Sequence, residues 1–81
     1  MKILNLDVRS EMEWDFDGHA PCAVNMPLET IPGNMDSLRG YDKINLVCRS
    51  GGRAAMAQRL LEQAGIREVF NLGAWQNLSC S

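Results

Sequence analysis

Short apolar runs alternate along this chain with segments that have the pattern of amphipathic helices. The runs cover residues 3–8, 23–26, 44–48 and 68–72. Between the last two, over residues 53–64, apolar side chains recur every three or four positions, the spacing of one helical face. Strands that alternate with helices at this spacing are typical of a parallel sheet with helical connections. We therefore predict an α/β fold, a small parallel sheet with helices on both faces.

Local signals indicate where the two clearest helices begin and end. Ser10 and Glu13 match a capping box, in which each side chain bonds to the backbone N–H of the other residue. A short helix is therefore expected over residues 11–17, ended by Gly18. Gly65 supplies the corresponding stop for the longer helix, because glycine readily adopts the left-handed conformation that follows a helix.

Size and charge exclude several classes of protein. A chain of 81 residues is too short for two cores, so residues 1–81 are interpreted as a single domain. Eight Lys and Arg against ten Asp and Glu give a net charge of −2, whereas sequence-independent nucleic-acid binding needs a basic face. The apolar runs are also far too short to cross a bilayer. We expect neither a nucleic-acid partner nor a membrane partner.

The cysteines are few and widely spaced. Cys22, Cys48 and Cys80 make an odd count with no Cys-x-x-Cys pair, which is a poor basis for a disulfide framework. A lone histidine, His19, supports no zinc cluster. The default expectation is therefore a reduced, cytoplasmic protein, and a mature periplasmic form that has lost its leader is the alternative.

The most informative segment follows the run at residues 44–48 and leads into the longer helix. Its sequence is Cys48-Arg49-Ser50-Gly51-Gly52-Arg53. In parallel sheets, ligands bind at the carboxyl ends of the strands, where this cysteine falls. Glycines let successive backbone N–H groups curl inward, and the helix N-terminus adds partial positive charge. A buried structural cysteine is the alternative. This setting instead favours a reactive cysteine, because it would stabilise a thiolate, a persulfide anion or a bound oxyanion.

Segments along nearly the whole chain resemble the rhodanese homology domain, a sulfurtransferase family, and in particular its small single-domain members. The matching segments, in order, are Asp7-Val8-Arg9-Ser10 with Glu13-Trp14, Gly18-His19 with residues 23–27, residues 46–54, and Asn71-Leu72-Gly73. Many members carry an extra helix before the first strand and a longer final helix. We therefore expect a domain that lacks the first of these helices and is shortened at its C-terminus.

The resemblance implies a mechanism through a persulfide on Cys48, with sulfur taken from a donor such as thiosulfate and passed to cyanide or a thiol. Arg49 would dock the anionic donor, and the backbone of Ser50, Gly51 and Gly52 would complete the binding loop. Arg53 would either bind the donor as well or pair with Asp7 and so position the loop. No metal or organic cofactor is needed. The implied partners are the small-molecule donor and acceptor, a sulfur-relay protein being a further candidate, for a monomer or weak homodimer.

Alternatives from other classes remain. A rhodanese-like module could carry sulfur or bind a protein while turning over small molecules poorly. Cysteine-dependent phosphatases use a similar cradle, but their loop has five residues between cysteine and arginine, whereas four separate Cys48 from Arg53 here. Cys22 or Cys80 could resolve a Cys48 persulfide as an internal disulfide, although neither has a basic neighbour that would activate it.

Overall fold

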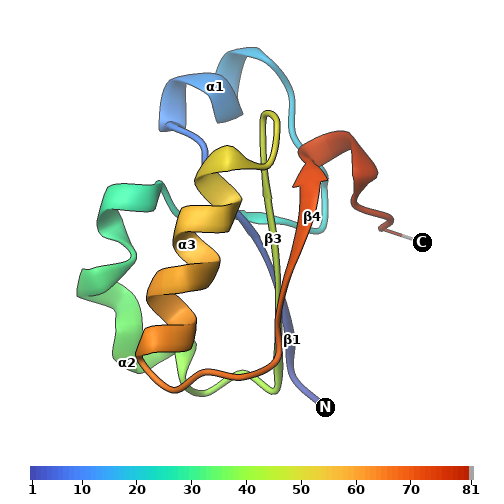
Figure 1. Cartoon of the computed structure of the whole chain (residues 1–81). Helices are drawn as coiled ribbons and strands as arrows, with labels where there is room; N and C mark the ends of the chain where they lie inside the picture. The colour runs from blue at the N-terminus through green and yellow to red at the C-terminus, as the bar shows by residue number, and fades with distance from the viewer. Residues whose placement is uncertain (81) are drawn as a thin grey trace.

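A computed structural model describes residues 1–80 of the chain as one layer of parallel strands with helices packed against it (Figure 1). The elements in chain order are β1 (Ile3–Asp7), α1 (Glu11–Phe16), β2 (Val24–Asn25), η1 (Leu28–Thr30), η2 (Pro32–Asn34), α2 (Met35–Leu38), β3 (Lys43–Cys48), α3 (Gly52–Gln63), β4 (Val69–Ala74) and η3 (Trp75–Asn77). The strand order is β2-β1-β3-β4, and every pair is parallel. The predicted α/β class and parallel sheet are confirmed.

The core lies between the sheet and the helices α2 and α3. Alternate side chains of the two central strands, such as Leu6 in β1 and Leu46 in β3, are fully buried on this face. They meet the small side chains of Ala54 and Ala57 on α3. Alanine on the inner face lets the helix approach the sheet closely, which also brings the start of α3 next to the end of β3.

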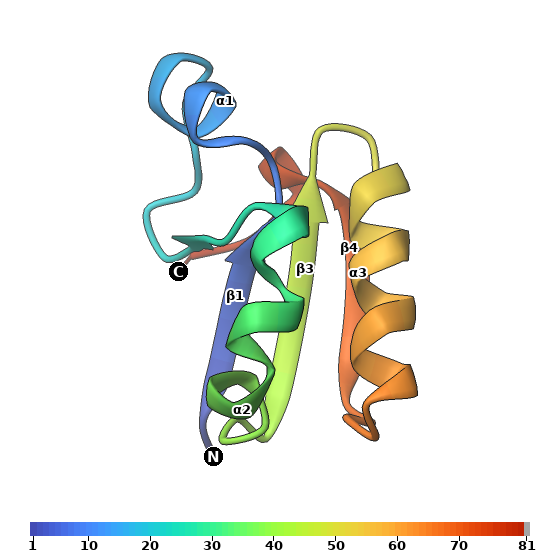
Figure 2. The ribbon, with the colours of Figure 1, turned by 90° about the vertical axis from the view of Figure 1, so that its left-hand side faces the viewer.

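The two faces of the sheet are covered unequally. Helices α2 and α3 lie on the same face, as Figures 1 and 2 show. The reason is that the connections β2–β3 and β3–β4 both run in the same direction across the sheet, and right-handed crossovers then place their helices on one side. The β1–β2 connection runs the other way, but its short helix α1 lies at the carboxyl end of the sheet (Figure 1). Within residues 1–80, helical cover of the second face is limited to the short η3 at its carboxyl end, so helices lie on both faces but cover them unequally (Figure 2).

The capping box predicted for α1 is present. The Ser10 hydroxyl accepts from the Glu13 backbone N–H at 3.2 Å, and the Glu13 carboxylate accepts from the Ser10 N–H at the same distance. None of the residues of α1 is buried, and Met12 and Phe16 are largely exposed. The helix therefore depends on its cap and on contacts of individual side chains rather than on a packed face.

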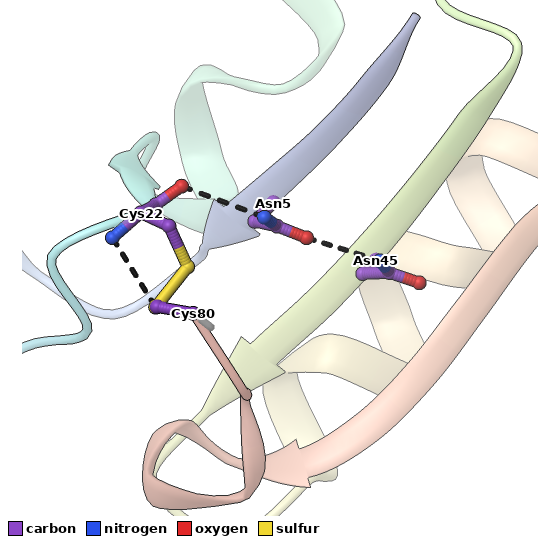
Figure 3. Close-up of a disulfide and its surroundings, with 4 residues drawn as sticks. All are labelled: Asn5, Cys22, Asn45 and Cys80. Atoms are coloured by element: carbon purple, nitrogen blue, oxygen red, sulfur yellow. Dashed lines mark hydrogen bonds between the residues drawn. A yellow bond between two sulfur atoms is a disulfide. The ribbon is translucent and has the colours of Figure 1, made fainter. Parts of the chain in front are cut away.

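On the second face, Cys22 and Cys80 form a disulfide, with their Cα atoms 5.5 Å apart (Figure 3). The expectation of a chain without disulfides is wrong for this pair. Cys22 precedes β2, and its carbonyl accepts from the Asn5 side chain, which in turn accepts from Asn45 of β3 at 3.0 Å. The bond thus joins the α1–β2 segment to the end of the chain, 58 positions away.

Candidate active site

Cys48 is the last residue of β3, and its side chain points to the face that α3 covers. The residue is only 1% exposed and belongs to the core cluster with Ile44 and Leu46, which share its side of the strand. The Cys22–Cys80 disulfide lies on the opposite face, beside Asn5 and Asn45 (Figure 3). The Cys48 thiol is the free cysteine of the described residues, and the sheet separates it from the other two sulfur atoms.

A tight turn carries the chain from Cys48 into α3. The Gly51 backbone N–H donates to the Cys48 Sγ at 2.8 Å. Gly51 has φ of +95°, a left-handed conformation that residues with a Cβ rarely adopt, and α3 starts at the next residue. The sulfur therefore faces a backbone donor at the positive end of a twelve-residue helix. Of the several inward-pointing N–H groups that the sequence predicted, the one at Gly51 contacts the sulfur.

Arg49 and Ser50 form the outer part of the turn. Both are exposed, and Arg49 takes part in none of the ion pairs that join residues 1–80. Its guanidinium is thus available to an anion that approaches from solvent.

Arg53 pairs with Glu13 of α1. The Arg53 Nη1 and Nη2 atoms donate to the two Glu13 carboxylate oxygens at 2.6 and 2.8 Å. This hydrogen-bonded arginine is the main reason why the pKa of Glu13 falls from 4.5 to about 2, and the same bonds raise the pKa of Arg53. Sequence reasoning identified Glu13 only as a capping residue and missed this second role.

Asp7 pairs with Arg9 and not with Arg53, so of the two alternative roles expected for Arg53, the pairing with Asp7 is wrong. The Asp7 carboxylate accepts from Arg9 Nε at 2.9 Å and from Arg9 Nη2 at 2.7 Å, and both residues are buried. Arg9 also donates to the Gly18 carbonyl at 2.7 Å and lies 5.0 Å from the Trp75 ring centre. The physical reason is strand alternation: Asp7 lies on the second face of β1, whereas Arg53 belongs to α3 on the first.

Asn71 of β4 also reaches the turn, a contact that sequence reasoning missed. Its side-chain Nδ2 donates to the Gly51 carbonyl at 3.0 Å. The signal that could have pointed to it is its place in the segment Asn71-Leu72-Gly73, which matched the family pattern.

Residues 1–80 lack two further kinds of feature, a metal cluster and a membrane-spanning helix. No group of three or more His, Cys, Asp and Glu side chains there is arranged to hold a metal ion. None of the helices in this part of the chain is both long and apolar enough to cross a membrane.

Comparisons with known proteins show the family to which the chain belongs. The family model described as "Rhodanese-like domain" matches residues 2–79. The chain is 34% identical over 67 residues to "Putative sulfur carrier protein YrkF" of Bacillus subtilis (strain 168), covering 83% of this chain and 36% of that protein. It is 33% identical over 70 residues to "Sulfurtransferase" of Allochromatium vinosum, covering 86% of this chain and 64% of that protein.

A solved structure shares the fold. The rhodanese-like domain protein from Staphylococcus aureus matches with a TM-score of 0.79 and 30% identity, over 98% of this chain and 76% of that one. The two curated relatives are longer, since this chain spans less than two thirds of either. A family match over nearly all of residues 1–81, joined to a matching fold, assigns the chain to the rhodanese-like domain family.

Proposed function

We propose that this chain is a sulfurtransferase that carries sulfane sulfur as a persulfide on Cys48. The observation that supports this most directly is the 2.8 Å contact from the Gly51 N–H to the Cys48 sulfur at the start of α3. A backbone donor and a helix N-terminus aimed at one sulfur atom stabilise negative charge there, both on the thiolate and on a persulfide. A relative named "Sulfurtransferase" adds support.

The proposed reaction has two half-reactions. The Cys48 thiolate attacks the outer sulfur of thiosulfate, a new S–S bond forms, and the old S–S bond breaks so that sulfite leaves with the electron pair. Cyanide or a thiolate then attacks the outer sulfur of the persulfide. The Cys48–sulfur bond breaks, the acceptor leaves with the sulfur, and the thiolate is restored.

The loop residues take separate roles in this proposal. Arg49, exposed and without an ion pair in the described chain, binds the anionic donor. The N–H groups of Ser50, Gly51 and Gly52 surround the transferred sulfur. Arg53 contributes positive charge from a position that Glu13 fixes. Asp7 supports the end of β1 through Arg9 and does not contact the donor.

Burial of Cys48 limits which molecules can reach it. With the residue only 1% exposed, a donor must enter the turn beside Gly51 rather than dock on an open thiol. Once loaded, the outer sulfur stands about 2 Å beyond the Cys48 sulfur, the length of an S–S bond. A small donor is therefore expected, and an acceptor has to reach only the outer sulfur of the persulfide.

The test is to incubate the protein with thiosulfate, measure its intact mass, and then add cyanide and measure thiocyanate. A gain of one sulfur atom that cyanide removes, absent in Cys48→Ser, is the expected result. The variant Arg49→Ala should raise the thiosulfate concentration needed for half-maximal loading. A folded protein that gains no sulfur from thiosulfate would refute thiosulfate as the donor.

A second candidate function is a sulfur-carrier module fed by a protein. It is favoured by the relative named "Putative sulfur carrier protein YrkF". This candidate predicts that thiosulfate fails to load Cys48 while a persulfide-bearing protein succeeds. Loading by thiosulfate, followed by many turnovers with cyanide, would decide against it.

A further inference from the structure

Both backbone polar groups of Gly51, its N–H and its carbonyl, are hydrogen-bonded. The Gly51 N–H donates to the Cys48 Sγ, and its carbonyl accepts from the Ala55 N–H at 2.9 Å and from the Asn71 side chain at 3.0 Å. The Ala55 bond is the first backbone bond of α3 and would form in any helix that begins here. The bond from Asn71 comes from another strand, so it is the contact that fixes this turn relative to the sheet.

The orientation of the Asn71 amide is itself determined. Its Oδ1 accepts from the Gly73 N–H at 2.9 Å while its Nδ2 donates to Gly51. An amide turned by 180° would face an N–H with its own donor and a carbonyl with its own acceptor, and would satisfy neither. The backbone that follows Asn71 is also fixed, because the Asn77 side chain donates to the Leu72 carbonyl at 2.8 Å.

The pairing of β4 with β3 places Asn71 beside the loop, and an irregularity follows it in β4. In the pairing of β3 with β4, Leu46 is opposite Asn71, but Cys48 is opposite Ala74, so β4 carries one extra residue at this point. Such a bulge bends the strand and redirects its side chains. Gly73, with φ of +81°, lies in the bulge, and its Cα is 3.4 Å from where a Cβ on Gly51 would stand.

From this arrangement we infer that Asn71 is a positioning residue, which keeps the Gly51 N–H aimed at the Cys48 sulfur. The inference rests on the proposed function for its significance, because the sulfur that this N–H contacts is the one that carries the persulfide. Asn71 does not touch the sulfur. It acts on the peptide unit that does, in the way that outer partners orient the groups contacting a reacting atom.

Two substitutions test the inference. Asn71→Asp keeps the size and the acceptor for Gly73 but cannot donate to Gly51, and Asn71→Leu removes both bonds without adding charge. Alkylation by iodoacetamide reports on Cys48 alone, since the other two cysteines are joined in the disulfide. Both variants should alkylate about tenfold more slowly than the original protein, the lower end of losses seen when orienting partners are removed. Sulfur uptake from thiosulfate should slow by a similar factor.

A matched control is Asn34, which donates to the Thr30 carbonyl at 2.8 Å in a part of the chain that does not contact the turn. Asn34→Asp and Asn34→Leu should alkylate at the original rate. Thermal unfolding followed by near-ultraviolet circular dichroism establishes that each variant is folded at the assay temperature. A folded Asn71→Leu protein that alkylates as fast as the original would overturn the inference.

Failure of the proposed function and failure of the positioning role of Asn71 give different results. If the original protein takes up no sulfur from thiosulfate, the proposed function fails, yet the alkylation comparison still tests Asn71. If the original protein and both Asn71 variants take up sulfur at the same rate, the positioning role fails while the proposed function stands.

Discussion

Glu13 and Arg53 form a two-pronged ion pair that joins helix α1 to the first turn of α3, with N–O distances of 2.6 and 2.8 Å. No residue of α1 is buried, so side-chain contacts such as this ion pair hold the helix to the rest of the fold. Since Arg53 also directly follows the turn between Cys48 and α3, the pair links the position of α1 to that of the turn.

The stability that Glu13 contributes should depend on pH. Its pKa is lowered from 4.5 to about 2, mainly by the hydrogen bond from Arg53. The contribution is therefore complete above pH 4.5 and is lost as the pH falls towards 2. Glu13→Gln keeps the capping box but loses the charge. Because the two side chains are partly exposed, it should lower the free energy of unfolding at pH 7 by up to about 1 kcal/mol.

Urea unfolding at pH 7 and at pH 2 measures this difference, which should nearly vanish at the lower pH. Glu29→Gln, an exposed glutamate outside the ion pairs of the described chain, is the control. An equal loss from Glu13→Gln at both pH values would contradict the assignment of its stabilising effect to the ionised carboxylate.

Breaking the Asp7–Arg9 pair should lower the free energy of unfolding far more than Glu13→Gln does. Both residues are buried, so Asp7→Asn leaves the Arg9 charge without its partner in a dry environment. A loss of about 3–5 kcal/mol is expected, measured by denaturant unfolding. The double variant Asp7→Asn/Arg9→Met removes both charges and should lose less than the two single variants added together. Additive losses would show that the two side chains act independently.

Reduction of the disulfide should destabilise the protein without stopping its chemistry. A bond that closes a loop of 58 positions raises the free energy of unfolding by about 4 kcal/mol in the chain-entropy account. Dithiothreitol should lower the unfolding midpoint of the original protein and leave a Cys22→Ser/Cys80→Ser variant unchanged. Sulfur loading of Cys48 in that variant should persist below its lower melting temperature. Loss of loading from the folded variant would instead connect the disulfide to the site.

The two adjacent glycines of the loop should respond differently to alanine. Gly51 has φ of +95°, whereas Gly52 is the first residue of α3 with open space where a Cβ would stand. Gly51→Ala should cost about 1–2 kcal/mol in backbone strain and slow sulfur uptake. Gly52→Ala should be neutral or stabilise by about 0.4–1 kcal/mol, because it restricts the unfolded chain. Thermal unfolding and the loading rate measure both effects, and equal effects at the two positions would be unexpected.

Features that depend on neighbouring residues could be predicted from the sequence. The apolar spacing at residues 53–64 predicted a helix that differs by one residue at each end from the observed α3, Gly52–Gln63. The capping box of Ser10 and Glu13 is formed as expected. The turn at Gly51 could also be anticipated, because a glycine between a strand and a helix indicates a left-handed conformation.

Features that depend on which face of the sheet a residue occupies, or on contacts between distant segments, could not be predicted from the sequence. Asp7 and Arg53 have complementary charges in the sequence, but the strand alternation of β1 and the crossover direction of α3 put them on opposite sides of the sheet. The contact of Asn71 with Gly51 depends on the pairing of β4 with β3, which the spacing of apolar residues does not reveal. The Cys22–Cys80 bond joins residues 58 positions apart, a distance at which an odd cysteine count gives no guidance.

The disulfide has a topological consequence for how the chain assembles. It turns residues 22–80 into a closed ring that contains β2, β3 and β4, while β1 lies outside the ring on the N-terminal tail. Yet β1 is the strand between β2 and β3. A chain that folds after oxidation must insert its N-terminal tail between two strands of one ring. A chain that folds first has only to form the Cys22–Cys80 bond afterwards. The order of folding and oxidation therefore decides whether β1 can pair with β2 and β3 before the ring is closed.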